Sequence, residues 1–189
     1  EIEGNITQIN VSRSGYISIV ISNTSYKSIV DVFDRNGKEV FRTNLVSSRV
    51  ADVSISQDSK YLAIAEVDLS GILIQSKIQV VSMELAQTNP NEAILYKYEA
   101  PTDELIMNIE YQEQNKLICM YNDRIEMLQE NTSTKLAEFE NRQLTFTTIQ
   151  LNNGIVLVEE ISAGGYTADT NINITNTISS KSREWPLHG

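Results

Sequence analysis

Apolar and polar residues alternate with a period of two along most of the chain, and aliphatic side chains recur at every second position. Because successive side chains of a β-strand point to opposite faces, this period predicts strands that bury one face. The pattern occupies the segments ITQINV, YISIVI, IVDVF, VADVSI, YLAIAEV, IQVVSM, IMNIEY, LICMY, RIEML, LTFTTI, IVLVEE and INITN. The most helix-like stretch, SMELAQTNPNEAIL, is interrupted at Asn89 and Pro90, which predicts one or two helical turns at most.

The strand pattern repeats four times. Segments beginning at residues 6, 50, 106 and 144 each read as strand, polar turn, strand, and each is followed by a third strand and a more polar fourth one. Four-stranded units in series are the sequence form of a β-propeller. We therefore predict an all-β fold with about four four-stranded antiparallel blades in a single domain, residues 1–189. The predicted blades are 5–45, 46–100, 101–141 and 142–187.

The stretch DVFDRNGKEVF, residues 31–41, has two candidate interpretations: an acidic metal-binding loop or a turn between strands. A calcium loop that began at Asp34 would need an oxygen ligand at its fifth position and Glu at its twelfth, where the chain has Lys38 and Leu45. Asn36-Gly37 instead suits a two-residue type I′ hairpin, which requires positive φ at both positions. The sequence therefore predicts a turn.

The chain resembles a known group of proteins. The turn SQDSKYLAIA is similar to the Ser-x-Asp-Gly-Lys-Tyr-Leu-Ala turn of propeller repeats, with Ser59 in place of glycine. The runs GYISIVISNTSYKSIVDVFDRNGKEVF, SISQDSKYLAIAEVDLSGILIQSKIQVVSM and NIEYQEQNKLICMYNDRIEML resemble an uncharacterised bacterial family of membrane-anchored, WD40-like propellers, best over residues 11–129.

This resemblance implies an extracytoplasmic protein, tethered to the cell membrane by an anchor outside this chain, and a propeller longer than the chain. It provides no catalytic residues. Two interpretations of the ring stand: closure at four blades, or an incomplete or larger ring whose open blade edges allow self-association.

The acidic charge of the chain limits the kinds of partner that it can bind. The net charge is −10, and residues 99–140 hold ten acidic and three basic residues. Phosphate binding needs clustered Lys and Arg, so we expect no nucleic-acid partner and no direct contact with an anionic membrane. The acidic stretch is either a solvated outer face or a patch for a basic partner. Cys119, the single cysteine, lies in the apolar run KLICMY, which predicts a buried thiol.

The sequence shows no recognisable arrangement of catalytic residues. The only histidine is His188, next to last, so we expect no histidine-based triad, no metal site and no cofactor. Glu66 and Asp68 share a face near a strand end, where they either carry solvated loop charge or bind a cation. Glu159 and Glu160 are neighbours in a strand and point to opposite faces.

Binding by a propeller usually involves the loops on its rigid scaffold. The connections between second and third strands are long at residues 22–27, 66–76 and 159–170 and short at 121–123. On these loops Tyr26, Asp68, Leu73 and Tyr166 are the candidate binding residues, since tyrosine offers contact area and a hydroxyl at little entropic cost. The alternative is that they only cap their own blades.

Two classes of function follow. The first is a non-enzymatic interaction module that binds a protein or peptide partner through the loops. The second is a small-molecule or glycan sensor, or the accessory propeller of a hydrolase whose catalytic domain is absent from this chain.

Overall fold

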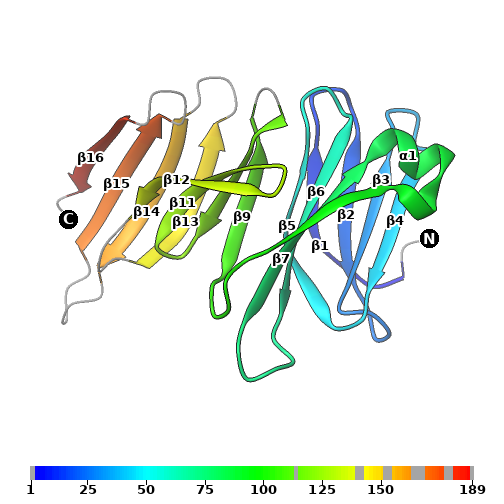
Figure 1. Cartoon of the computed structure of the whole chain (residues 1–189), viewed down its shortest axis with the longest axis horizontal. Coiled ribbons are helices and arrows are strands. Elements are labelled where there is room, and N and C mark those ends of the chain that lie inside the picture. The colour runs from blue at the N-terminus through cyan, green and yellow to red at the C-terminus, as the bar shows by residue number, and fades with distance from the viewer. Residues whose placement is uncertain are drawn as a thin grey trace.

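The protein is a row of four four-stranded antiparallel sheets, each built from strands that are consecutive in sequence. The computed structural model describes residues 3–112 and 115–138 with their side chains, and the backbone of the strands at 143–150, 155–162, 169–176 and 181–187. In Figure 1 the sheets follow one another along the long axis of the molecule, with sheet 1 and sheet 4 at opposite ends. The predicted all-β fold of four-stranded units is confirmed, and the sheets of the described residues form an open row.

The sheets are numbered in chain order. Sheet 1 contains β1 (Asn5–Val11), β2 (Ile17–Ser22), β3 (Ser28–Phe33) and β4 (Glu39–Leu45), and sheet 2 contains β5 (Ser48–Ile55), β6 (Tyr61–Asp68), β7 (Gln75–Ser82) and β8 (Ile94–Glu99). Sheet 3 contains β9 (Ile106–Tyr111), β10 (Leu117–Tyr121), β11 (Arg124–Gln129) and β12 (Thr132–Glu138), and sheet 4 contains β13 (Gln143–Gln150), β14 (Ile155–Ser162), β15 (Asp169–Asn176) and β16 (Lys181–Leu187).

The first strand of every sheet has a β-bulge at the same position. One residue near the start of the strand has no partner in the ladder with the second strand: Thr7, Ala51, Met107 and Thr145. A bulge increases the local twist and re-aims the residues that follow it. Its recurrence gives a structural alignment of the four repeats that is independent of residue identity.

The first hairpins of sheets 1, 2 and 3 each contain a residue with left-handed backbone. Gly15 has φ 84°, Ser59 has φ 58° and Asn115 has φ 58°. In sheet 1 the Gly15 N–H donates to the Ser12 carbonyl at 3.0 Å, and in sheet 2 the Ser59 N–H donates to the Ser56 carbonyl at 2.8 Å. The predicted polar turns are confirmed here, and Ser59 occupies the conformation that glycine adopts at least cost.

The turn at Asn36-Gly37 joins β3 to β4 as predicted, but the predicted type I′ geometry is wrong. Only Gly37 has positive φ, at 78°, and its N–H donates to the Asp34 carbonyl at 2.9 Å. The Asp34 carboxylate accepts the N–H groups of Asn36 at 2.8 Å and Lys38 at 2.9 Å. These bonds favour a right-handed turn that ends in one left-handed glycine, a common three-residue hairpin loop.

Among the residues that the structure describes, one short helix interrupts the strands, as the sequence predicted. α1 (Met83–Thr88) is followed by a 3₁₀ turn, η1 (Pro90–Glu92), and the Leu85 N–H donates to the Ser82 side chain at 3.2 Å, which caps the helix. Met83 is buried between sheets 1 and 2. The helix therefore closes the outer end of this interface.

Two layers of apolar side chains hold sheets 1, 2 and 3 together. Val20 and Val32 of sheet 1 pack with Leu62 and Ile64 of sheet 2. The other face of sheet 2 packs on sheet 3 through a layer that includes Ala63, Ala65, Ile78, Ile109 and Leu117. Side chains on alternate positions of sheet 2 therefore face different neighbours, which explains why its strands are apolar on both faces.

Polar contacts between first strands set the spacing of the sheets. Gln8 donates to the Asp52 carboxylate at 2.5 Å, and the Ile109 N–H donates to the same carboxylate at 2.9 Å. The Tyr111 N–H donates to the Ser54 hydroxyl at 3.0 Å. The first strand of sheet 2 thus satisfies backbone donors of sheet 3 with its side chains.

Candidate interaction faces

The connections between strands lie at two opposite ends of the sheets. We call the end with the connections from second to third strands and between sheets the loop face. The other end, with the hairpins from first to second and from third to fourth strands, is the hairpin face. Of the predicted site residues, Tyr26 and Leu73 lie in connections of the loop face, and Asp68 ends the strand that leads into one of them.

Tyr26 lies half-buried in the connection between β2 and β3. The Asn23 side chain accepts the N–H groups of Ser25 at 2.9 Å and Tyr26 at 2.8 Å, which folds this loop onto itself. Lys27 donates to the Ser47 carbonyl at 2.9 Å, so the loop is fixed to the connection that leads into sheet 2.

Asp68 is the last residue of β6, and Leu73 lies in the connection between β6 and β7, which spans residues 69–74 and is shorter than predicted. The Asp68 carboxylate accepts both the N–H and the hydroxyl of Ser70, at 2.8 and 2.6 Å. These bonds, with the nearby charge of Lys27, lower the pKa of Asp68. Asp68 is therefore engaged in shaping the turn, whereas Leu73 points into solvent with about half of its surface exposed.

An apolar patch on the same loop was not anticipated. Ile72 is fully exposed, and Leu69 and Leu73 are each more than half exposed. Val46, in the connection from β4 to β5, is also exposed. We call residues 69–74 the apolar loop. The signal was present in DLSGIL, where aliphatic residues occupy a turn instead of a strand.

The C-terminal end of the apolar loop is anchored to the connection between sheets 2 and 3. The Ile74 N–H donates to the Asp103 carboxylate at 3.1 Å, and the Asp103 N–H donates to the Ile74 carbonyl at 3.0 Å. Asp103 lies between sheets 2 and 3 and has φ 67°. Anchoring reduces the conformational entropy that Ile72 and Leu73 would lose on binding.

Glu66 does not belong to this face, and its predicted solvated position is wrong. Its side chain is completely buried and accepts from the Ser48 hydroxyl at 2.6 Å, from Lys77 at 3.2 Å and from Gln79. A buried carboxylate needs such partners. Since all of its contacts are internal, Glu66 has no part in a cation site with Asp68.

The hairpin face has a groove between sheets 2 and 3 that the sequence did not indicate. Its volume is about 450 Å³. Three tyrosines and an exposed leucine form its apolar part, and amide side chains form much of its rim; the lining is Tyr61, Val80, Leu95, Tyr96, Tyr111, Asn115, Gln129, Glu130 and Asn131. Burial raises the pKa of Tyr96 to about 12, so its hydroxyl is a neutral donor at physiological pH.

A smaller hollow of about 160 Å³ lies where the first strands of the described sheets meet, and Glu110 lines it. Burial raises the pKa of Glu110 to about 7, and the charge of Asp52 contributes to the shift. Burial also raises the pKa of Asp52, although its hydrogen bonds oppose the shift. Of these two carboxyls, Glu110 is the one whose pKa lies near neutral pH.

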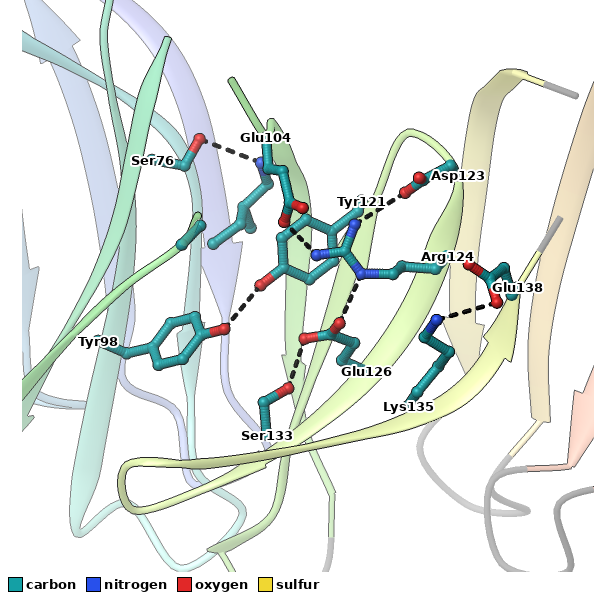
Figure 2. A network of polar contacts seen from close by, with 12 residues as sticks. Ser76, Tyr98, Glu104, Tyr121, Asp123, Arg124, Glu126, Ser133, Lys135 and Glu138 are labelled. Carbon is teal, nitrogen blue, oxygen red and sulfur yellow. Dashed lines mark hydrogen bonds and ion pairs between the residues drawn. The ribbon is translucent and has the colours of Figure 1, made fainter. Parts of the chain in front are cut away.

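Arg124 is the centre of a buried ion network at the interface between sheets 2 and 3 (Figure 2). Its guanidinium donates to Glu126 at 2.5 Å, to Asp123 at 3.0 Å and to Glu104, and it lies 3.9 Å from the centre of the Tyr121 ring.

The network continues on both sides of the guanidinium. Glu126 also accepts from Ser133, and the Tyr121 and Tyr98 hydroxyls are 3.2 Å apart, which links sheet 3 to sheet 2. Burial would raise the pKa of Glu126, but the bonds from Arg124 and Ser133 outweigh it and lower the pKa. Three carboxylates occupy one guanidinium, so the network holds the structure together and leaves no cation for an anionic ligand.

The chemistry of the described residues is limited. No group of three or more His, Cys, Asp or Glu side chains that would suit a metal ion occurs within residues 3–112 and 115–138. Cys119 is buried, as predicted, and burial raises the pKa of its thiol. Glu159 and Glu160 both lie within β14, and Trp185 lies in β16. Tyr166 and His188 lie outside the described residues.

No helix in the described part of the chain combines the length and the apolar character that crossing a membrane requires.

The geometry of meandering four-stranded sheets packed face to face defines a β-propeller-type domain, and comparison with solved structures agrees. The chain is similar to oligogalacturonate lyase from Vibrio parahaemolyticus (TM-score 0.67, 11% identity, 99% of this chain and 55% of that one). It is also similar to the Swd1 β-propeller domain from Myceliophteria thermophila (TM-score 0.65, 10% identity, 100% and 57%). A third similar structure is the propeller domain of the Trilobed protease from Pyrococcus furiosus, which has an open velcro topology (TM-score 0.57, 12% identity, 97% and 57%).

At these identities the likeness concerns the fold alone, and the chain spans little more than half the length of these structures. No curated protein matches the sequence. The model of the family of unknown function DUF5711 matches residues 1–181, and the chain belongs to this family. The expectation of an uncharacterised propeller family is confirmed to that extent, while the membrane anchor and the extracytoplasmic location stay predictions.

Proposed function

We propose that this propeller is a non-enzymatic interaction module that binds a protein or peptide partner through its loop face, tethered outside the cytoplasm by an anchor beyond this chain. The observation that carries the proposal is the apolar loop, in which exposed Leu69, Ile72 and Leu73 stand on a base anchored to Asp103. Exposed aliphatic side chains gathered on one rigid loop are typical of a protein contact. Complementarity with a net charge of −10 favours a partner segment in which apolar residues are flanked by Lys or Arg.

The test uses peptides of known sequence. Peptides are selected from a random display library on the wild-type protein, and their affinities are measured by fluorescence anisotropy. The variant Ile72→Asp/Leu73→Asp places charge on two exposed positions, so it should fold normally and weaken binding by at least about tenfold. Leu95→Asp, at a similarly exposed leucine of the hairpin face, is the matched control and should leave the affinity within about twofold. Equal binding to wild type and the loop variant would refute the proposal.

The groove of the hairpin face supports a second candidate, a sensor of neutral glycans or similar small molecules. Tyrosine rings such as Tyr61 and Tyr96 offer faces for stacking, and Asn115, Gln129 and Asn131 offer amide donors and acceptors. Titration calorimetry with a panel of neutral oligosaccharides tests it. Binding that is lost in Tyr96→Ala and unchanged in Ile72→Asp/Leu73→Asp would favour the sensor, and no heat with any sugar would count against it.

A further inference from the structure

The outward face of sheet 1 exposes a row of aliphatic side chains. On β1, Ile6, Ile9 and Val11 are 47%, 56% and 68% exposed. Ile9 and Val11 pair across the ladder with Ile19 and Ile17 of β2, which are half-buried and continue the apolar surface. This face lies on the opposite side of sheet 1 from sheet 2, because Gln8 and Asn10, at the alternate positions of β1, contact sheet 2.

The same positions in the next two sheets are buried. The residue two places after the bulge is Ile9 in sheet 1, Val53 in sheet 2 and Ile109 in sheet 3. Val53 is 2% exposed and Ile109 is fully buried, whereas Ile9 is 56% exposed. In sheets 2 and 3 this position therefore holds an aliphatic side chain that the preceding sheet covers. Among the three sheets whose side chains are described, only sheet 1 has no preceding sheet over it.

The first strands of sheets 1 and 2, which each cover the next sheet, do so with polar side chains. Asn10 of sheet 1 donates to the Val53 carbonyl at 2.8 Å. In the next interface Asp52 and Ser54 of sheet 2 accept the N–H groups of Ile109 and Tyr111 at 2.9 and 3.0 Å. In both interfaces two alternate residues of the covering first strand are polar and bond the strand they cover: Asp52 and Ser54 both bond its backbone, while in sheet 1 Asn10 bonds the backbone and Gln8 the Asp52 carboxylate. The shared bulge gives β1 the same register, so its backbone at Ile9 and Val11 is oriented for the same contacts.

Asp31 on β3 supplies an independent observation on this face. It pairs across the ladder with Ile19, and its side chain is about 95% buried. One carboxylate oxygen binds Arg42 at 3.1 Å, while the other, Oδ1, is buried without a hydrogen-bond partner among the described residues. At the matching position of β11, Glu126 accepts from Arg124 and Ser133. An unpaired buried carboxylate oxygen is costly, which points to a donor from a covering element.

We infer that the outward face of sheet 1 is a docking face for one further blade of the same repeat type, whose first strand carries polar side chains at the positions of Asp52 and Ser54 and whose donor reaches Asp31. This inference concerns assembly of the scaffold and is independent of the proposed partner binding. The covering blade excludes water from Ile6, Ile9 and Val11 as sheet 2 does for β9.

A tandem protein tests the docking face directly. A second copy of residues 46–105 is joined directly before Ile6. In the native chain this segment precedes β9 and its sheet covers β9. In the tandem protein it precedes β1 in the same way. Ile9→Cys is introduced into the 189-residue chain and into the tandem, and the rate of maleimide labelling is measured. Buried Cys119 is the silent background thiol. We expect labelling of Cys at position 9 to be at least about tenfold slower in the tandem.

Two control measurements distinguish docking of the added copy from a general change in thiol reactivity. Ile72→Cys, on the apolar loop, should react equally fast in both proteins. Asp52→Ala/Ser54→Ala in the added copy should restore much of the labelling at position 9. Equal labelling at position 9 in the chain and in a tandem that shows the added β-signal by circular dichroism would overturn the inference.

A second measurement needs no fusion. In the 189-residue chain, Ile9→Lys/Val11→Lys should leave Tm within about 2 °C of wild type, while Val53→Lys at the covered equivalent should lower it by about 10 °C or more. A similar loss in both variants would show that the face is already covered within the chain and would overturn the inference. Protection of position 9 that rises with protein concentration, together with a doubled mass in sedimentation, would assign the face to a second copy instead.

Discussion

The Asp52 carboxylate on β5 accepts the backbone N–H of Ile109 on β9 at 2.9 Å, across a sequence separation of 57 residues. The same carboxylate accepts from Gln8 on β1 and from the Val53 N–H. One side chain therefore connects the first strands of three sheets, at the position where a propeller faces its axis.

Asp52→Ala should be strongly destabilising, because it leaves the Ile109 N–H and the Gln8 amide without their acceptor in a buried site. We expect a loss of about 2–4 kcal/mol in the free energy of unfolding, measured by urea denaturation. Asp58→Ala, at an exposed turn of the same sheet, is the control and should cost less than about 1 kcal/mol. Equal effects of the two substitutions would mean that Asp52 does not join the sheets in solution.

Glu110 should make the protein less stable as the pH rises. Its folded pKa of about 7 exceeds the ordinary value of 4.5, so the folded state binds the proton more tightly than the unfolded chain does. The resulting stability is fully present below about pH 4.5 and is lost as the pH rises through about 7, with a size on the order of 1–2 kcal/mol.

The measurement for Glu110 is the urea midpoint between pH 5 and pH 8. Glu110→Gln should remove this component of the pH dependence, and Glu99→Gln, at an exposed position of β8, should retain it. An unchanged pH profile in Glu110→Gln would contradict the prediction.

Arg124→Met should destabilise the interface between sheets 2 and 3, because Glu104 and Glu126 would keep their charge without the guanidinium. The expected cost is about 3–5 kcal/mol. In the double variant Arg124→Met/Glu126→Met part of this loss should return, which a double-mutant cycle measures. The exposed pair Lys135–Glu138, 2.9 Å apart, is the control, and Lys135→Ala should change stability by less than about 1 kcal/mol.

Two turn positions allow a clean test of backbone strain. Gly37 has φ 78°, and a Cβ there would meet no atom within 4 Å, so Gly37→Ala should cost about 1 kcal/mol from conformation alone. Ser59 has φ 58°, so Ser59→Gly should stabilise the protein by about 0.5–1 kcal/mol. Thermal unfolding monitored by circular dichroism gives both values, and a stabilised Gly37→Ala would show that this turn rearranges freely.

Much of the fold could be predicted because its signals are local. A period of two marks a strand wherever it occurs, and Gly, Asn and Ser in the hairpins report backbone conformation at their own positions. The failure at Asn36-Gly37 was also local in origin, since the Asp34 side chain selected a different loop from the one that Asn-Gly alone favours.

The site could be predicted less well because burial and pairing depend on distant residues. Glu66 is buried only because Ser48, Lys77 and Gln79 converge on it from other strands. The partner of Arg124 in the connection between sheets, Glu104, is twenty residues away along the chain. The tyrosine groove requires two sheets to be in place, and nothing in either repeat alone indicates it. Ile72, in contrast, was visible in the sequence as an aliphatic residue inside a turn.

Each of the four sheets formed by the described strands is completed by four successive strands, and none of them includes a strand from another repeat. A gene segment that encodes one repeat therefore encodes one entire sheet, and its duplication or loss breaks no hydrogen-bonded ladder. Such a protein can change its number of repeats during evolution by tandem duplication, with selection acting mainly on the one layer of side chains where old and new repeats meet.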